Sequence, residues 1–423
     1  MKNLALINKK AKLIIALLLV ASITLGFTAI QKPDPEKDRV LISLLKFALT
    51  KGHYQPKDFN DDFSELVYKN FIKNLDPSKR YFLQSDIEAF SEYKNLIDDQ
   101  IKAEDLTFFK LVYGRYKERV KEVESFYSEL LTAPFNFNKK EEIELKYEEI
   151  QYAKTDAERI KKWQKELKLN AISGLMDRID LEKEKHKKEA SYHEKSFKEI
   201  EVEVRESIQN TMGDFFKRML ELNEDDGFSA FLNTITLAFD PHTTYFAPQD
   251  KKRFDISMAG KLEGIGARLQ KKGDFTKVVE LISGGPAWKK GELEVGDIIL
   301  KVAQGNKEPL DIVGMRLDDA IEFIKGKKGT EVQLTLKKIS GGIKVISIIR
   351  DIVELEEVFA KSSIVEKNGV KYGIINLPKF YIDFKKSNSR NSATDMTKQI
   401  EYLKQEKVQG ILIDLRNNGG GSL

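Results

Sequence analysis

The residues best suited to chemistry lie close to the end of the sequence, in the stretch "DLRNNGGG" that begins at Asp414. An apolar run, Ile411 to Ile413, precedes this stretch and is typical of a buried strand. Consecutive glycines after a strand allow backbone N–H groups to converge on an anion or on a polarised carbonyl oxygen. The sequence therefore predicts one half of a ligand site at the end of a buried strand.

The chain also contains the residue types of a serine protease triad, in Asp414, His242 and Ser422. Triads are defined by geometry and not by chain order, so this arrangement has to be weighed. Ser422 lacks the strand–turn–helix context of a nucleophile elbow, and we interpret it as an ordinary loop residue. His242 follows Asp240-Pro241, and we interpret it as a brace of that turn.

The histidine pattern gives metal binding no support. The chain has 4 histidines and no cysteine, and no pair of histidines has H-x-x-x-H spacing. His186 and His193 belong to a charged helical segment, where a solvated helix face explains both. We therefore predict no metal site.

The glycine patterns do not predict a phosphate site either. "EGIGARL" has Gly264 and Gly266 but Leu269 where a dinucleotide fingerprint needs glycine, and no G-x-x-x-x-G-K-[ST] occurs. A nucleotide-binding α/β protein is therefore the weakest alternative, and we predict no cofactor. A glycine loop that enters an edge strand can instead present backbone N–H groups to the terminal carboxylate of a peptide.

Three kinds of segment must position these loops. From about residue 34 to residue 226 apolar side chains recur at spacings of three and four, as between Leu106 and Leu130, which predicts packed helices. From about residue 255 to residue 338 short strand-like runs alternate with glycines, with one late helix predicted over 317–324. Further on, two strand-like runs flank a helix predicted over 391–405, an order that favours parallel strands.

Motifs in these segments give the chain a family resemblance. "SGGPAWKKGELEVGDIILKV" closely resembles a PDZ domain. With "FDPHTTYFAP" before it and "DLRNNGGG" after it, the chain resembles C-terminal-processing (tail-specific) serine proteases of the bacterial envelope. The helical front end, with "NLDPSKRYFLQSDI", is similar to the N-terminal domain of the tail-specific subgroup, so the resemblance covers about residues 34–423.

The resemblance implies a serine endopeptidase with a lysine general base. A lysine desolvated in an apolar pocket loses its charge and can then accept the serine proton. The family places both residues after the glycine loop, so we expect the Ser/Lys dyad beyond Leu423 and expect this chain to bind substrates without cleaving them. The resemblance also assigns the backbone N–H of Gly419 to the oxyanion hole, and a glycine turn that needs a positive φ is the alternative.

The resemblance further implies that the PDZ block captures the C-terminus of a substrate. Its carboxylate is predicted to bind the backbone of Ile265, Gly266 and Ala267. The apolar walls for the last side chain, each of which also suits an ordinary PDZ core, are predicted at Leu262, Leu269, Met315, Leu317 and Ile321.

The predicted fold class is multidomain α+β. The predicted domains are a signal peptide or membrane anchor (1–30), a helical domain (31–226), a connecting segment of the protease platform (227–254), a PDZ domain (255–340) and the incomplete start of an α/β protease core (341–423).

Charge and targeting features describe the expected surroundings. The formal charge of +4 arises from 71 basic and 67 acidic residues, and the first thirty residues supply four lysines and no acid, so the remaining chain is neutral. This balance argues against a nucleic-acid partner. The apolar segment 13–30 predicts an export signal, or an inner-membrane anchor near the minimum spanning length. We expect a periplasmic or envelope location, and the lack of cysteine excludes a disulfide framework.

Two functions follow. The first is a tail-specific serine endopeptidase that acts on proteins with apolar C-termini, with an adaptor lipoprotein on the helices as a candidate partner. The second is a non-catalytic envelope PDZ adaptor that binds protein C-termini. An open parallel sheet edge at the glycine loop is an aggregation hazard, which favours the first.

Overall fold

The structure, a computed structural model, describes residues 35–146, 149–189, 191–385 and 389–422. It comprises two units that divide between Tyr245 and Phe246, and each is described by itself. The predicted signal or anchor over residues 1–30 lies outside the described residues. Among the residues that are described, no helix is both long enough and apolar enough to cross a membrane.

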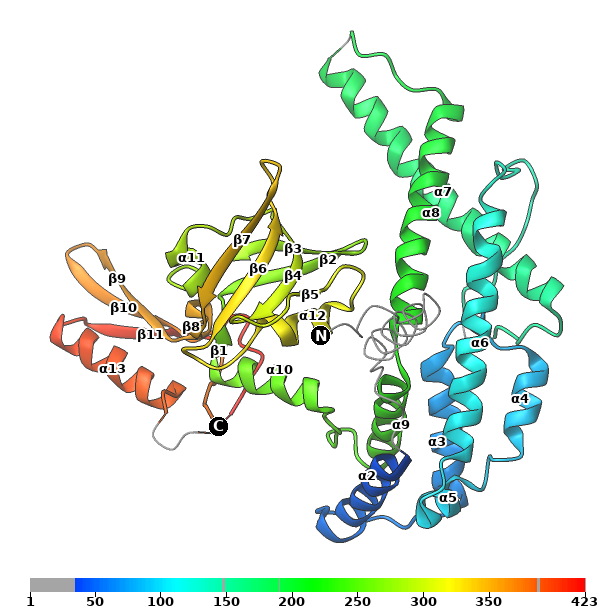
Figure 1. The fold of residues 1–423 in the computed structure, drawn as a ribbon, viewed down its shortest axis with the longest axis horizontal. Coiled ribbons are helices and arrows are strands. Elements are labelled where there is room, and N and C mark those ends of the chain that lie inside the picture. The colour runs from blue at the N-terminus through cyan, green and yellow to red at the C-terminus, as the bar shows by residue number, and fades with distance from the viewer. Residues whose placement is uncertain (1–34, 147–148, 190, 386–388, 423) are drawn as a thin grey trace, which may run out of the picture. The chain divides into compact units, whose positions relative to one another are not determined.

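The first unit is helical and runs from blue to green in Figure 1. A short π-helical turn, Ala48–Gly52, follows its first helix. The helices are α2 (Pro35–Phe47), α3 (Asp61–Leu75), α4 (Gln84–Ser91), α5 (Ile97–Ala103), α6 (Thr107–Leu130), α7 (Asp156–Lys188), α8 (Phe197–Glu221) and α9 (Glu224–Phe239).

Aromatic side chains at helical spacing build the core of this unit. In α6, Phe109, Tyr113 and Tyr116 are buried, as the periodicity predicts. Phe231 of α9 stacks on Phe109 with ring centroids 5.6 Å apart, and Phe71 of α3 packs edge-on against Phe231. Burial of each such ring contributes about 2 kcal/mol, which holds α3, α6 and α9 together.

The motif "NLDPSKRY" closes α3 and forms the loop before α4, and Asp76 explains the shape of this loop. The Asp76 carboxylate is 1% exposed and accepts the backbone N–H groups of Arg80, Tyr81 and Phe82 at 2.9, 3.0 and 2.9 Å. These three donors satisfy a buried carboxylate that would otherwise strongly destabilise the fold. The motif therefore has a structural role in the helical unit.

Residues 227–254, which the sequence assigns to a connecting segment, divide between the two units. Phe228 and Ile235 belong to α9 and lie in the helical core. The turn after α9 is held by Asn233, whose side chain donates to Tyr245 O at 3.1 Å and accepts from Tyr245 N at 2.8 Å. The helical unit therefore extends to Tyr245.

The prediction that His242 braces this turn is wrong. His242 is exposed, and its backbone N–H donates to Asp240 Oδ1 at 2.7 Å. The turn needs an acceptor for this N–H, and a carboxylate two residues earlier supplies it. The histidine that braces the turn is His53, with Nε2 3.2 Å from Thr243 Oγ1 and its ring edge-on to Phe239.

The second unit begins with α10 (Pro248–Ala259) and contains a six-stranded antiparallel sheet whose main path has the order β2-β3-β4-β6-β7. A two-residue strand, β5 (Leu310–Asp311), pairs with β4, and two short helices, α11 (Pro286–Lys290) and α12 (Leu317–Ile324), accompany the sheet (Figure 1). The sheet strands are β2 (Ala267–Lys272), β3 (Phe275–Leu281), β4 (Ile298–Gln304), β6 (Glu331–Lys337) and β7 (Ile343–Ile349).

Alternating burial explains this sheet. Val332, Leu334 and Leu336 of β6 are fully buried, as a period of two predicts for a strand with one covered face. Residues 341–349, which the sequence assigns to the protease core, form the end of the β6–β7 turn and strand β7. Strand β7 pairs with β6 over its whole length, from Glu331↔Ile349 to Lys337↔Ile343.

A separate pair of strands flanks this sheet. Strand β1 (Lys261–Gly264) pairs antiparallel with β8 (Asp351–Glu354), so the segments that enter and leave the sheet lie side by side. A single 3₁₀ turn, Glu356–Val358, follows β8.

The last part of the unit contains β9 (Lys361–Lys367), β10 (Val370–Asn376), α13 (Ser392–Gln405) and β11 (Gly410–Asp414) in a sheet of order β11-β10-β9. The parallel pairing of β10 with β11 confirms the predicted strand–helix–strand unit. Gly373 allows α13 to approach the sheet, because a methyl group there would lie 2.6 Å from Leu403 Cδ1.

The prediction that the strand before the glycine loop is buried is wrong. Ile411, Leu412 and Ile413 are 39%, 59% and 49% exposed. Among the described strands β11 pairs with β10 alone, so it is an edge strand. An apolar run cannot by itself show which faces of a strand are covered, because that depends on neighbours distant in sequence.

Candidate functional site

The loop between β1 and β2 has a backbone shape that requires glycine. Gly266 has a φ of +75°, in the left-handed region that side chains disfavour. A methyl group at this position would lie 3.1 Å from Gly285 Cα and 3.3 Å from both Pro286 Cδ and Val353 Cγ2. The loop is therefore packed tightly between α11 and β8.

Two carbonyl groups of this loop accept hydrogen bonds from the protein, whereas two of its N–H groups find no protein acceptor in the described part of the chain. Ile265 O accepts from Ala287 N at 2.8 Å, and Gly266 O accepts from Ile282 N at 2.9 Å. Within the described part of the chain, neither the Ile265 nor the Gly266 N–H donates to a protein acceptor. The arrangement suits a carboxylate, which accepts hydrogen bonds from such N–H groups.

Strand β2 and helix α12 lie side by side next to this loop. Strand β2 is the last strand in the sheet order, so one of its edges has no partner among the described strands. Helix α12 packs beside β2 and β4. An unpaired strand edge beside a helix is the arrangement that adds an extended peptide as a further strand.

The side chains of helix α12 lie in three environments. With 3.6 residues per turn, neighbouring positions point to different faces of the helix. Ala320 and Ile324 are buried in the core beneath the β2-β3-β4-β6-β7 sheet, whereas Leu317 and Ile321 are half-buried. On a third face two carboxylates form ion pairs with α10, Asp318 with Arg253 Nη1 at 3.0 Å and Glu322 with Lys252 Nζ at 2.5 Å.

The C-terminal end of α12 is held by a buried guanidinium that the sequence does not reveal. Arg350 is 2% exposed, and its Nε donates to Ile324 O at 2.9 Å while Nη2 donates to Phe323 O at 3.1 Å. It donates further to Thr330 Oγ1 at 3.0 Å and to Gln304 Oε1 at 2.8 Å. These acceptors are neutral, and burial accordingly lowers the pKa of Arg350.

Lys325 lies against the start of the glycine loop, and sequence reasoning missed it. A methyl group built on Gly264 would lie 3.5 Å from Leu262 Cδ1 and 3.6 Å from Lys325 Cγ. Burial lowers the pKa of Lys325, although Glu322 and Asp318 act in the opposite direction. A partly desolvated ammonium in this position complements an incoming carboxylate. Its only signal in the sequence is its place directly after the predicted helix.

The predicted groove residues occupy different environments. Leu262 is half-buried on β1, and Leu317 and Ile321 are half-buried on α12. Leu269 and Met315 pack against the buried PDZ core. These residues lie on or next to the elements that surround the glycine loop. The contact of each side chain with a peptide stays a prediction.

The C-terminal glycine loop is tied to the segment after β10. Asn418 Nδ2 donates to Leu377 O at 2.9 Å, and its Oδ1 accepts from Gly420 N at 2.8 Å. Phe380 N donates to Gly420 O at 3.1 Å, and a methyl group on Gly421 would overlap the Phe380 carbonyl oxygen. The loop therefore has little freedom in its second half.

The positive φ angles of this loop occur at Asn417 (+65°), Gly420 (+102°) and Gly421 (+143°), and Gly419 lies outside that region. Gly419 is exposed, with open space where a Cβ would stand. Within the described residues its N–H has no protein acceptor. A glycine turn explains Gly420 and Gly421, and Gly419 retains an N–H for a ligand.

The arrangement around Asp414 and Ser422 differs from that of a catalytic triad. Arg416 donates to the Asp414 carboxylate from Nε at 2.9 Å and from Nη2 at 2.6 Å, which holds the pKa of Asp414 at about 2. Ser422 N donates to Phe380 O at 3.0 Å, and the unit that contains Ser422 has no histidine. Over the described ranges no cluster of three or more acidic or histidine side chains is placed to hold a metal ion.

The fold and site define a chain with a helical unit, a PDZ-type sheet with a glycine loop, and the first strands of an α/β domain. Residues 46–249 match the family described as Tail specific protease N-terminal domain, residues 254–337 match the PDZ domain family, and residues 371–423 match peptidase family S41. The chain belongs to the C-terminal-processing (tail-specific) protease family and carries a PDZ domain.

Two relatives agree with this assignment in sequence, and a solved structure is similar to one part of the chain. The Tail-specific protease of Haemophilus influenzae is 33% identical over 377 residues, which cover 89% of this chain and 50% of that protein. The Carboxy-terminal processing protease CtpA of Bacillus subtilis is 32% identical over 182 residues, 43% of this chain and 35% of that protein. The PDZ domain of a Carboxy-Terminal Protease from Vibrio cholerae, solved in complex with peptide, is 41% identical, with a TM-score of 0.22, and covers 22% of this chain and 99% of that one. The chain thus spans half the length of the Haemophilus relative.

Proposed function

We propose that this chain recognises the apolar C-terminus of protein substrates in the groove between β2 and α12, as the substrate-binding part of a tail-specific serine endopeptidase. The observation that carries the proposal is the pair of N–H groups in the glycine loop, beside a strand edge that has no partner among the described strands.

In the proposed complex the terminal carboxylate accepts hydrogen bonds from the backbone of Ile265, Gly266 and Ala267. The peptide backbone then pairs with the free edge of β2. Leu317 and Ile321 contact the last side chain, with the remaining contacts from Leu262, Leu269 and Met315. Hydrogen bonds to a charged group contribute about 2 kcal/mol each, so the loop favours a free carboxylate over an amide.

Lys325 adds a positive charge at the same end of the groove. Its stem contacts the glycine at the start of the loop, and its charged form is disfavoured by burial in the absence of a ligand. A bound carboxylate restores the favourable environment of the ammonium. We therefore include Lys325 among the residues that recognise the carboxylate.

For catalysis we propose that Gly419 N–H donates to the oxyanion of the tetrahedral intermediate. One such donor lowers the barrier by roughly 3 kcal/mol in a serine protease. A serine nucleophile and a lysine general base, which the family places after the glycine loop, would complete the site in the full-length protein. The lysine would take the serine proton as the serine oxygen attacks the peptide carbonyl, and would pass that proton to the leaving amine when the peptide bond breaks. Water would then hydrolyse the acyl-enzyme.

Titration with labelled peptides tests the recognition step. The chain is titrated by fluorescence anisotropy with a peptide that ends in apolar residues, with its C-terminal amide, and with a version that ends in lysine. We expect the free apolar terminus to bind most tightly and amidation to weaken binding at least tenfold. Equal affinity for the acid and the amide would contradict the carboxylate site.

Incubation of the full-length protein with a tailed substrate tests the catalytic step. Cleavage that depends on an apolar tail supports the endopeptidase. Tight binding with no cleavage would instead favour the non-catalytic PDZ adaptor.

We also propose export to the periplasm or cell envelope through residues 1–30, and an adaptor lipoprotein as a partner of the helical domain. Fractionation of cells that produce the tagged protein tests the first point, and recovery of the tag in the cytoplasm would contradict it. Co-purification from detergent-solubilised envelopes tests the second.

A further inference from the structure

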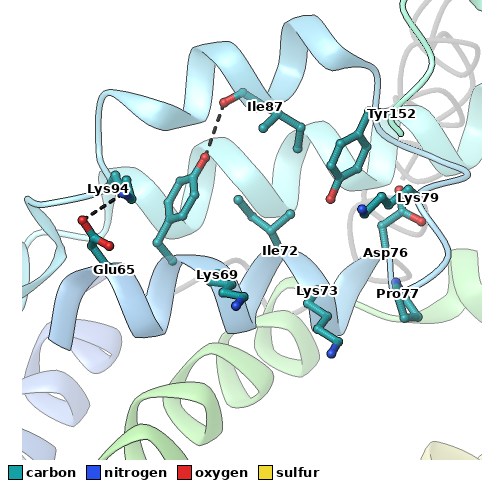
Figure 2. A pocket seen from close by; sticks show the side chains of 11 residues that line it. Glu65, Lys69, Ile72, Lys73, Asp76, Pro77, Lys79, Ile87, Lys94 and Tyr152 are labelled. Carbon is teal, nitrogen blue, oxygen red and sulfur yellow. Dashed lines mark hydrogen bonds and ion pairs between the residues drawn. The ribbon is translucent and has the colours of Figure 1, made fainter. Parts of the chain in front are cut away.

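A groove in the helical unit is used by neither the tail site nor the glycine loop at the C-terminal end. It lies between α3 and α4 and has a volume of about 590 Å³ (Figure 2). Ile72 of α3 and Ile87 of α4 face each other across it, and Tyr152 stands at one end. The Tyr68 hydroxyl donates to Ile87 O at 3.4 Å, so the ring is fixed along the apolar floor.

Lysines surround this apolar floor. Lys69 and Lys73 lie one helical turn apart on α3, about 6 Å along the helix axis. Both are exposed, and neither forms an ion pair with an acid in the described part of the chain. Lys94, at the other end of the groove, is neutralised by Glu65 at 2.8 Å.

The end of the groove near Tyr152 offers further donors. Lys79 Nζ lies 5.6 Å from the centroid of the Tyr152 ring and donates to Ile150 O at 2.6 Å. Burial raises the pKa of Tyr152, so its hydroxyl keeps its proton and can donate to an anion. Asp76, the remaining acid of the lining, already accepts three backbone N–H groups and is almost fully buried.

We propose that the α3–α4 groove binds a peptide segment of a partner protein in which acidic residues alternate with apolar ones. The apolar side chains would lie on Tyr68, Ile72 and Ile87, and the carboxylates would pair with the lysines. The spread of Lys69 and Lys73 along α3 favours a peptide over a fatty acid, because a single carboxylate could pair with one of the two lysines and would leave the other unpaired. The site lies in the helical unit and is independent of the tail groove.

A peptide of alternating glutamate and leucine tests the proposal. About seven residues span roughly 23 Å when extended, which matches the length of α3. The peptide is acetylated at its N-terminus, carries a fluorophore and is amidated at its C-terminus, so the tail groove has no carboxylate to bind. Anisotropy titrations with the whole chain are run at low and high salt, with a glutamine–leucine peptide as the neutral comparison.

The charge-reversal variant Lys69→Glu/Lys73→Glu is expected to weaken binding about tenfold, because two attractive ion pairs become repulsive. The matched control Lys121→Glu/Lys198→Glu makes the same charge change at exposed positions outside the groove and is expected to bind within twofold of the parent. Added salt should weaken binding of the glutamate–leucine peptide and leave the affinity of the glutamine–leucine peptide unchanged.

Three results would overturn the proposal. The first is an absence of binding, and the second is equal loss of affinity in the groove variant and in its control. The third is tighter binding of decanoate than of the peptide at the same groove, which would assign the groove to a lipid-like anion. Circular dichroism of both double variants verifies that the helices remain folded, and a failed tail titration would not affect any of these outcomes.

Discussion

Replacement of Arg350 by methionine tests how the groove wall is held in place. The change keeps an unbranched apolar side chain as long as the arginine stem but removes the guanidinium, which donates to the carbonyl oxygens of Ile324, Phe323 and Glu331 at 2.9, 3.1 and 3.2 Å. The other two acceptors, on Thr330 and Gln304, are side chains that can turn toward solvent.

The magnitude follows from the acceptors that cannot turn. Phe323 O keeps a hydrogen bond from Gln304 Nε2 at 2.7 Å, and Glu331 O keeps one from Gly305 N at 3.2 Å. Ile324 O is therefore the carbonyl that loses its donor, which costs about 1–3 kcal/mol if it stays buried. Loss of a cation at the end of α12 adds up to about 1 kcal/mol. The desolvated guanidinium has no carboxylate partner among the acceptors described above, and its removal recovers part of this cost. We therefore expect Arg350→Met to destabilise α12 by about 2 kcal/mol.

Hydrogen exchange measured by mass spectrometry provides the assay. Amide protection across α12 should fall roughly 25-fold, since each 1.4 kcal/mol changes an equilibrium tenfold. Protection in the helical unit should remain unchanged and serves as an internal control. The loss of α12 protection in Arg350→Lys should be smaller than in Arg350→Met, because an ammonium keeps the charge but cannot reach all these acceptors.

The same variant should bind apolar tail peptides more weakly, because Leu317 and Ile321 lie on the helix that it releases. A change in α12 protection of less than fivefold would refute the reasoning. It would mean that Ile324 O finds water or that the packing of Ala320 and Ile324 alone holds the helix.

Three further predictions concern the loop, the lysine and the response to acid. Gly266→Ala and the control Gly273→Ala both place a side chain at positive φ (+75° and +59°), which costs about 1 kcal/mol in each variant. Of these two positions, only 266 has atoms within 4 Å of the new methyl group. Tail affinity should therefore fall only for Gly266→Ala, and equal affinity in both variants would remove the loop from the site. Lys325→Met should reduce the preference for a free carboxylate over an amide about tenfold in the anisotropy assay, and an unchanged acid-to-amide ratio would show that the backbone alone reads the carboxylate. Hydrogen bonds from Lys185 and the Tyr192 hydroxyl lower the pKa of Glu182 from 4.5 to about 2; because the folded pKa is the lower one, its stabilising effect is complete above about pH 4.5 and is lost as the pH falls toward 2. Exchange protection at the α7–α8 turn should fall over that pH range in the parent but not in Glu182→Gln, and identical pH profiles would contradict this.

Local patterns in the sequence determined much of the architecture. The helices over 317–324 and 391–405 appear at α12 and α13 because spacing and capping act within a few residues. The parallel pairing of β10 with β11 followed from the strand–helix–strand order. The glycine loop at Gly266 was found because a positive φ and a close approach of backbone atoms both call for glycine.

Only the tertiary structure decided which local elements share a core and which polar groups meet. Three features depend on partners far away in sequence. They are the exposure of Ile411–Ile413, the pairing of β7 within the PDZ sheet, and the burial of α9 among the helices. Arg350 lies 26 positions from the carbonyl of Ile324 that it binds, and no local pattern shows which charged residue will be buried. The α3–α4 groove likewise arises where Ile72 meets Ile87 and Tyr152, because packing across long loops creates a cavity that periodicity does not encode.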